Sequence, residues 1–165
     1  MVLWGDADAG ASDVTSLGWV LVRASQVPIA TGLFTWPSDD PRLIGSSCQV
    51  CGTTTFPAQG SCPRCTAEAM DEQVLPRTGT LWSFTVQGFR PKDPYAGPEE
   101  FEPYGVGYVE LPGQVIVESR LTENDPDRLE IGMPMELVIV PFRRDESGDD
   151  VMTFAFRPAV EGTKE

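Results

Sequence analysis

The 165-residue sequence predicts a mainly β protein in which an N-terminal segment and a zinc ribbon precede a small closed barrel of five strands. Two observations lead to this fold class. The chain has four cysteines, and they form two Cys-x-x-Cys hooks separated by ten residues. Five β-rich segments, separated by Gly, Pro and Asp turns, follow Gly79. The predicted divisions are the N-terminal segment (1–42), the ribbon (43–77), the barrel (78–160) and a tail (161–165).

The N-terminal segment contains two aromatic residues that need a surface to cover them. Residues 1–27 are rich in Gly, Ala, Asp and Ser, with a small apolar patch around Trp19. Phe34 and Trp36 follow, in a stretch that mixes large apolar residues with turn formers. They pack either on the chain's own core or against a partner protein. Partner docking through Phe34 and Trp36 is the functional hypothesis for this segment.

The ribbon contains the metal ligands Cys48, Cys51, Cys62 and Cys65. Four thiolates in two short hooks can surround one zinc ion as a tetrahedron, with Zn–S distances of about 2.3 Å. Gly52 suits the tight turn after the first hook. Thr53–Phe56 reads as a short strand between the hooks. Because the protein fills all four positions, we expect one structural zinc ion that does no chemistry.

Other uses of the four cysteines fit the sequence less well. Two disulfides would need an oxidising compartment, and nothing in the sequence directs the chain to one. A redox dithiol would need one hook beside a βαβ pattern, which is missing here. An iron–sulfur centre accepts the same four ligands, but two-hook ribbons of this spacing more often hold zinc.

The barrel is predicted from segments in which bulky and polar residues alternate or apolar residues run together. These segments are Thr80–Phe89, Gly105–Leu111, Gln114–Leu121, Met135–Phe142 and Val151–Phe156. Asn124–Gly132 can hold one helical turn between the third and fourth segments. An OB-type barrel also has five strands. The arrangement is therefore compatible with an OB fold.

Two loops of the predicted barrel differ in character. Arg90–Pro103 is fourteen residues long and carries four prolines. Loops of this length in compact domains are more often functional than idle. Arg143–Asp150 is a charged hairpin tip, which we interpret as solvated surface.

Composition disfavours several functions. The formal net charge of −13 disfavours nucleic acids and anionic membranes, because binding to phosphates is carried by Lys and Arg. No stretch approaches the roughly 20 apolar residues of a membrane span. The apolar run Leu17–Val22 follows acidic rather than basic residues, unlike a signal peptide. Cysteines suited to metal rather than to disulfides then predict a cytoplasmic protein.

The chain has no histidine, which disfavours catalysis by the isolated chain. A Ser-His-Asp triad and a Cys-His pair are both impossible, and the four thiols are committed to metal. Carboxylates would serve as acid or base only if burial raised their pKa. We expect no catalytic residue in this chain and no enzyme activity on its own.

Ribbon and barrel in this order resemble the acyl-CoA-associated zinc-ribbon plus OB-fold family, domain of unknown function 35. The resemblance lies in the segments 43–65 (LIGSSCQVCGTTTFPAQGSCPRC), 79–91 (GTLWSFTVQGFRP), 105–121 (GVGYVELPGQVIVESRL), 131–142 (IGMPMELVIVPF) and 153–158 (TFAFRP). It covers about residues 28–158 and implies a rubredoxin-like zinc ribbon followed by an OB-fold barrel. Thr66 departs from the family, which often has Gly after the fourth cysteine.

The resemblance implies a non-catalytic partner of a thiolase-superfamily enzyme, in a hetero-oligomer that meets acyl-CoA through that partner. The specific expectation is a lipid-transfer-protein-type aldolase that cleaves a steroid side-chain acyl-CoA by a retro-aldol reaction. We expect Phe89, Arg90, Lys92 and Tyr95 to lie near the partner's active-site mouth and the acyl-CoA entrance. In the plainer alternative, Arg90 and Lys92 only pair with glutamates of the same loop.

Two other function classes remain open. An OB-fold module can bind nucleic acid through stacked aromatics, here Trp82, Phe84 and Tyr108. Residues 78–142 contain eleven acidic and four basic residues, a net charge of −7, which argues against it. An autonomous enzyme with carboxylate catalysis rests only on abundant Asp and Glu, which more often solvate a surface.

Overall fold

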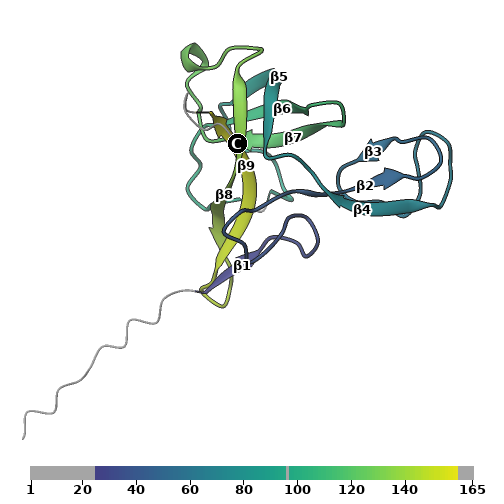
Figure 1. The fold of residues 1–165 in the computed structure, drawn as a ribbon. Helices are drawn as coiled ribbons and strands as arrows, with labels where there is room; N and C mark the ends of the chain where they lie inside the picture. The colour runs from purple at the N-terminus through teal and green to yellow at the C-terminus, as the bar shows by residue number, and fades with distance from the viewer. Residues whose placement is uncertain (1–24, 96, 160–165) are drawn as a thin grey trace, which may run out of the picture.

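The computed structural model describes residues 25–95 and 97–159, and strands dominate this part of the chain (Figure 1). The strands are β1 (Gln26–Pro28), β2 (Ile44–Cys48), β3 (Thr54–Thr55), β4 (Met70–Val74), β5 (Thr78–Gln87), β6 (Tyr104–Leu111), β7 (Val115–Leu121), β8 (Pro134–Arg144) and β9 (Asp150–Pro158). The helical element of the described residues is the 3₁₀ turn η1 (Pro126–Arg128). No described helix has the length and apolar character needed to cross a membrane.

Strands β5 to β9 form a closed barrel. The order is β5-β6-β7-β9-β8, and β8 pairs with β5 to close the ring. All these pairs are antiparallel except β7 with β9. Five strands with one parallel pair between the third and the last, closed by the fourth on the first, form an OB fold. The predicted five-stranded barrel is therefore confirmed.

Alternation of buried and outward-facing residues explains why such segments form barrel strands, as β6 shows. On β6 the buried residues are Gly105, Gly107, Val109 and Leu111, while Tyr108 and Glu110 face outward. Gly107 has a packing role, because a Cβ there would lie within about 3 Å of the side chains of Leu81 and Leu121. The missing side chain leaves room in the barrel core for these two leucines.

The ribbon is a three-stranded sheet in the order β3-β2-β4, projecting to one side of the barrel (Figure 1). The short strand expected at Thr53–Phe56 is β3. The sequence did not predict β1, β2 or β4. The ribbon touches the barrel where the rings of Phe56 and Phe154 meet edge to face, with centroids 5.5 Å apart.

The N-terminal segment contributes to the same core as the barrel. Phe34 is 3% exposed and forms an isolated antiparallel β-bridge with Leu43. Both residues belong to the main hydrophobic cluster, together with Leu75. Trp36 is half-buried against this cluster, with its ring 6.1 Å from that of Phe34. Burial leaves Phe34 no surface to offer a partner. The docking expectation is therefore corrected for Phe34, which packs on the chain's own core.

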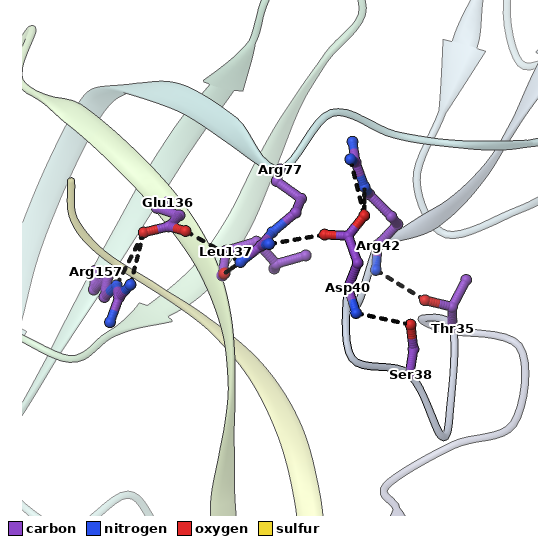
Figure 2. Close-up of polar contacts among 8 residues, drawn as sticks. All are labelled: Thr35, Ser38, Asp40, Arg42, Arg77, Glu136, Leu137 and Arg157. Atoms are coloured by element: carbon purple, nitrogen blue, oxygen red, sulfur yellow. Dashed lines mark hydrogen bonds and ion pairs between the residues drawn. The ribbon is translucent and has the colours of Figure 1, made fainter. Parts of the chain in front are cut away.

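A chain of ion pairs holds the junction between ribbon and barrel (Figure 2). Arg77 lies between β4 and β5, and its guanidinium bonds Asp40 at 2.8 Å and Glu136 at 3.1 Å. Arg157 bonds the other oxygen of Glu136 at 2.8 Å. Glu136 is buried, so its charge needs both arginines. The network joins the N-terminal segment, the linker and strands β8 and β9.

Candidate metal centre

The four cysteine sulfurs converge at the tip of the ribbon. All four Sγ atoms lie within 4.8 Å of one another. The Cys48–Cys65 and Cys51–Cys62 sulfur pairs are each 3.6 Å apart. A tetrahedron with Zn–S bonds of about 2.3 Å has sulfur–sulfur edges of about 3.8 Å. The observed spacing fits one zinc ion held by Cys48, Cys51, Cys62 and Cys65.

The two hooks have matching backbone geometry. The N–H of Gly52 donates to the carbonyl of Cys48 at 2.9 Å, and the N–H of Thr66 donates to that of Cys62 at 2.9 Å. Each residue follows the second cysteine of its hook and has a positive φ, 70° at Gly52 and 59° at Thr66. Among the described residues, Thr66 is the single non-glycine with positive φ. The sequence prediction of a tight turn at Gly52 is confirmed.

Local hydrogen bonds and mutual repulsion separate the thiol pKa values. Bonds from Thr53 lower the pKa of Cys51 to about 6. The backbone N–H of Cys65 lowers the pKa of Cys62. The N–H of Ala67 also acts to lower the pKa of Cys65, but the Cys51 sulfur and burial outweigh it and raise that pKa to about 12. Four thiolates this close repel one another, and a divalent cation removes that repulsion.

The donor set makes this centre structural. Four sulfurs fill a tetrahedral zinc ion and leave no position for water or substrate. Cys48 and Cys62 are buried, while Cys51 and Cys65 are partly exposed at the surface of the tip. When bound, zinc therefore cross-links the two hooks.

The residues expected at an acyl-CoA entrance lie on the proline-rich loop between β5 and β6. Arg90 packs over the Tyr95 ring at 5.3 Å and donates to the carbonyls of Pro98 and Glu99. It therefore ties the loop to itself through backbone oxygens rather than through glutamate side chains. Phe89 is 71% exposed, and Lys92 is also exposed. The structure thus brings Arg90 and Tyr95 together and leaves Phe89 and Lys92 outward.

The three aromatics considered for nucleic-acid stacking separate into two environments. Phe84 is half-buried and packs against the core. Trp82 and Tyr108 are exposed on the outer face of β5 and β6, with ring centroids 6.3 Å apart. The Tyr108 hydroxyl donates to Glu118 at 3.0 Å, and this contact raises the pKa of Tyr108. A carboxylate beside the exposed rings repels phosphate.

Two features of the structure outside the metal centre were not found from the sequence. One is the buried Glu136 with its two arginines, which are 59 and 21 residues away along the chain. The other is Arg120 on β7, whose guanidinium lies 3.9 Å from the centroid of the Tyr104 ring. Its only sequence signal was a basic residue in a strand within an acidic barrel.

Comparison with known proteins identifies the family. Residues 35–71 match the family model described as the ChsH2 rubredoxin-like zinc ribbon domain, and residues 72–140 match the ChsH2 C-terminal OB-fold domain. A DUF35 domain-containing scaffold protein of Methanocaldococcus jannaschii is 33% identical, over 70% of this chain and 79% of that protein. The chain belongs to the DUF35 family. The resemblance stated from sequence motifs is thereby confirmed.

Two further relatives carry more specific descriptions. Benzoylsuccinyl-CoA thiolase subunit BbsA of Thauera aromatica is 30% identical, over 71% of this chain and 76% of that protein. A solved structure described as an Ltp2-ChsH2(DUF35) aldolase matches with a TM-score of 0.56 and 30% identity. That match covers 72% of this chain and 86% of the solved chain.

Proposed function

We propose that this DUF35 protein is a non-catalytic subunit that binds and stabilises a thiolase-superfamily enzyme acting on acyl-CoA. The match to the Ltp2-ChsH2(DUF35) aldolase carries the proposal, because it joins sequence identity with a shared fold. The description of BbsA as a thiolase subunit supports it independently. The specific partner we propose is a lipid-transfer-protein-type aldolase that cleaves a steroid side-chain acyl-CoA.

The division of labour follows from the side chains available. The chain has no histidine, and its four thiols fit zinc. A retro-aldol or thiolytic step needs a positioned acid or base, which the partner then supplies. In this proposal the present chain contributes shape: the zinc-braced ribbon, the barrel, and the proline-rich loop that bears Phe89 and Lys92. The cytoplasm, where thiols stay reduced, is the proposed compartment.

Contact with the partner is proposed through two surfaces. Phe89, Arg90, Lys92 and Tyr95 of the proline-rich loop lie at the partner's active-site mouth in this proposal. Exposed aromatics often anchor protein interfaces, and Phe89 is the most exposed large apolar side chain of the described residues. The half-buried Trp36 remains a second candidate contact.

Co-expression tests the proposal directly. The full chain is co-expressed with each thiolase-superfamily protein of its source genome, and complexes are isolated by affinity and size-exclusion chromatography. We expect one of these proteins to co-purify, and its thermal midpoint and its acyl-CoA turnover to rise in the complex. If no such protein binds, or if the partner is equally stable and active alone, the proposal is wrong.

Variants then locate the contact. Phe89→Ala is compared with Val50→Ala, which truncates an equally exposed apolar residue at the ribbon tip. We expect weaker binding for Phe89→Ala only. Equal affinities for both variants would exclude Phe89 from the contact while leaving the subunit assignment intact.

A further inference from the structure

The arginines of this acidic chain fall into two groups. Those that form ion pairs are Arg42, Arg77, Arg128, Arg144 and Arg157. In the described part of the chain, four arginines have no carboxylate at ion-pair distance, namely Arg64, Arg90, Arg120 and Arg143. Arg64, Arg90 and Arg143 are exposed to solvent, whereas Arg120 is half-buried, so the environment of Arg120 is the one that needs an explanation.

Three of the four line one groove under the proline-rich loop. A hollow of about 850 Å³ lies between this loop and the β8–β9 hairpin. Its charged lining residues are Arg90 and Arg143, the ion-paired Arg144 and Asp150, and Glu99. It shares Pro98, Pro141 and Phe142 with a second hollow of about 350 Å³, which Arg120 lines. Because they share these lining residues, the two hollows lie side by side, and together they are called the groove below. Volumes of this size suit a small-molecule ligand.

Arg120 is held in place by two aromatic rings. Its guanidinium carbon lies 3.9 Å from the centroid of the Tyr104 ring and 5.6 Å from that of Phe142. Burial raises the pKa of Tyr104, so the ring meets Arg120 as a neutral phenol. Contact with ring faces fixes the guanidinium plane and leaves its edge N–H groups free to form hydrogen bonds.

Nothing in the described part of the chain accepts those hydrogen bonds. No hydrogen bond or ion pair joins the guanidinium of Arg120 to a described residue. The Arg120 carbonyl, by contrast, accepts from the Ser119 hydroxyl at 2.9 Å. Glu100, Glu102 and Glu118 line hollows that Arg120 also lines, but none of them forms an ion pair with Arg120. Glu118 accepts from the Tyr108 hydroxyl instead. An oriented guanidinium with unused donors matches the two oxygens of a phosphate or carboxylate.

We propose that Arg120 anchors a binding site for a phosphate-bearing small molecule, which extends along the groove toward Arg90 and Arg143. Phosphate is favoured over a single carboxylate because Arg90, Arg120 and Arg143, which have no carboxylate at ion-pair distance, line the two hollows and suit a ligand with several negative charges. Arg90 also belongs to the surface proposed above for the partner, but all lining residues of the groove come from this chain, so ligand binding can be tested without the partner.

Binding of inorganic pyrophosphate to the full, zinc-loaded chain tests the inference. Affinity is measured by calorimetry at low ionic strength, and arginine Nε–H signals are followed by NMR. We expect binding with a shift of the Arg120 signal. Arg120→Gln should weaken binding at least about tenfold, the loss expected for a charged hydrogen bond. Arg128→Gln, at a paired and exposed arginine outside the groove, should bind like the wild type.

A variant that removes a negative charge near Arg120 distinguishes an effect on ligand binding from an effect on folding. Glu102→Gln removes a negative charge from the hollow that Arg120 lines, so it should strengthen pyrophosphate binding by a few-fold. Arg120→Lys keeps the charge without the planar fork and should bind more weakly than wild type. Thermal unfolding of each variant confirms that it is folded.

Three results would overturn the inference: no binding to the wild type, equal binding by Arg120→Gln, or no gain in Glu102→Gln. Malonate is the second probe. If malonate binds as tightly as pyrophosphate with the same dependence on Arg120, the site belongs to a carboxylate and the phosphate assignment is wrong.

Discussion

Thr66 and Gly52 occupy the same position in the two cysteine hooks, but only Gly52 is free of a side chain there. The left-handed backbone conformation, with positive φ, costs an L-residue about 1–2 kcal/mol. This cost also applies to the β-branched Thr66. The Thr66 hydroxyl offsets part of this conformational cost by donating a hydrogen bond to the carbonyl of Cys65 at 2.7 Å. The second hook therefore carries local strain that the first avoids.

We expect Thr66→Gly to stabilise the zinc-loaded chain by up to about 1 kcal/mol, because the relief of strain exceeds the added chain entropy of glycine. The mirror change, Gly52→Thr, should destabilise it by about 1–2 kcal/mol. Denaturant unfolding and the rate of zinc transfer to a chelator measure both effects. If the two substitutions shift stability in the same direction, backbone strain is not what distinguishes the hooks.

Asp40 gives a pH-dependent prediction. Hydrogen bonds from Arg77 and then Arg42 hold the pKa of this carboxyl below its ordinary value of 3.8. A lowered folded-state pKa contributes stability above the unfolded pKa, and that stability is lost as the pH falls through the folded value. We expect Asp40→Asn to reduce stability at pH 7 and to make no difference well below pH 3.8. Unfolding curves across this range check it, with the neighbouring exposed Asp39→Asn as the control.

At the scale of elements, the Arg77–Glu136–Arg157 network fixes where the ribbon meets the barrel (Figure 2). Glu136 sits on β8, Arg157 on the paired strand β9, and Arg77 just before β5. The Leu137 N–H also donates to the carbonyl of Arg77 at 2.7 Å. One buried carboxylate thus ties three segments of the chain together.

We expect Glu136→Gln to destabilise the chain by about 1–3 kcal/mol, because Arg157 then loses its carboxylate and Arg77 keeps only Asp40. Glu110→Gln on β6, at an exposed residue with no ion pair among the described residues, should change stability little. Thermal unfolding measures both. An equally large loss of stability in Glu110→Gln would show that the removal of surface charge, and not the ribbon–barrel junction, is responsible.

The elements that the sequence predicted share a physical property. The five barrel segments are long; the first three alternate and the last two are largely apolar, so their burial is visible in the residues themselves. β1 has three residues and β4 reads MDEQV, which gives no apolar periodicity. These strands form because neighbouring strands offer open hydrogen bonds, a tertiary effect that local patterns do not contain.

The metal site was predictable for a different reason. Ligand spacing is local, so two hooks identify Cys48 and its partners without knowledge of the fold. Arg120 and Glu136 depend on contacts between residues distant in sequence, such as Arg77 and Glu136. Phe34 shows the limit of local patterns: its turn-rich segment left packing on the chain's own core and docking on a partner both open, and the structure buries it in the core.

For the whole molecule, the main question is how far the metal supports the fold. The base of the ribbon is not separate from the barrel, because Leu43 and Leu75 belong to the same core cluster as Leu137 and Phe156. The tip has no such cluster among the described residues, and its exposed residues include Val50. Stability should therefore depend on zinc more strongly toward the tip.

We expect removal of zinc by a strong chelator, or Cys62→Ser, to unfold the tip and leave the barrel folded. Zinc supplies on the order of 10 kcal/mol to ribbons of this kind, whereas the barrel is held by its own core. Hydrogen exchange should become fast from Ser46 to Thr55. The Leu75 N–H, bonded to the Leu43 carbonyl at 2.9 Å in the shared core, should stay protected.

Elemental analysis should first show about one zinc per chain, since four sulfurs fill a single tetrahedral ion. If the chelated chain kept protection throughout the tip, the sulfur cluster would not be the brace of the ribbon. If β5 to β9 lost protection together with the tip, zinc would support the entire chain. The predicted boundary lies between these limits, at Leu43 and Leu75, because apolar burial replaces the metal as the source of stability there.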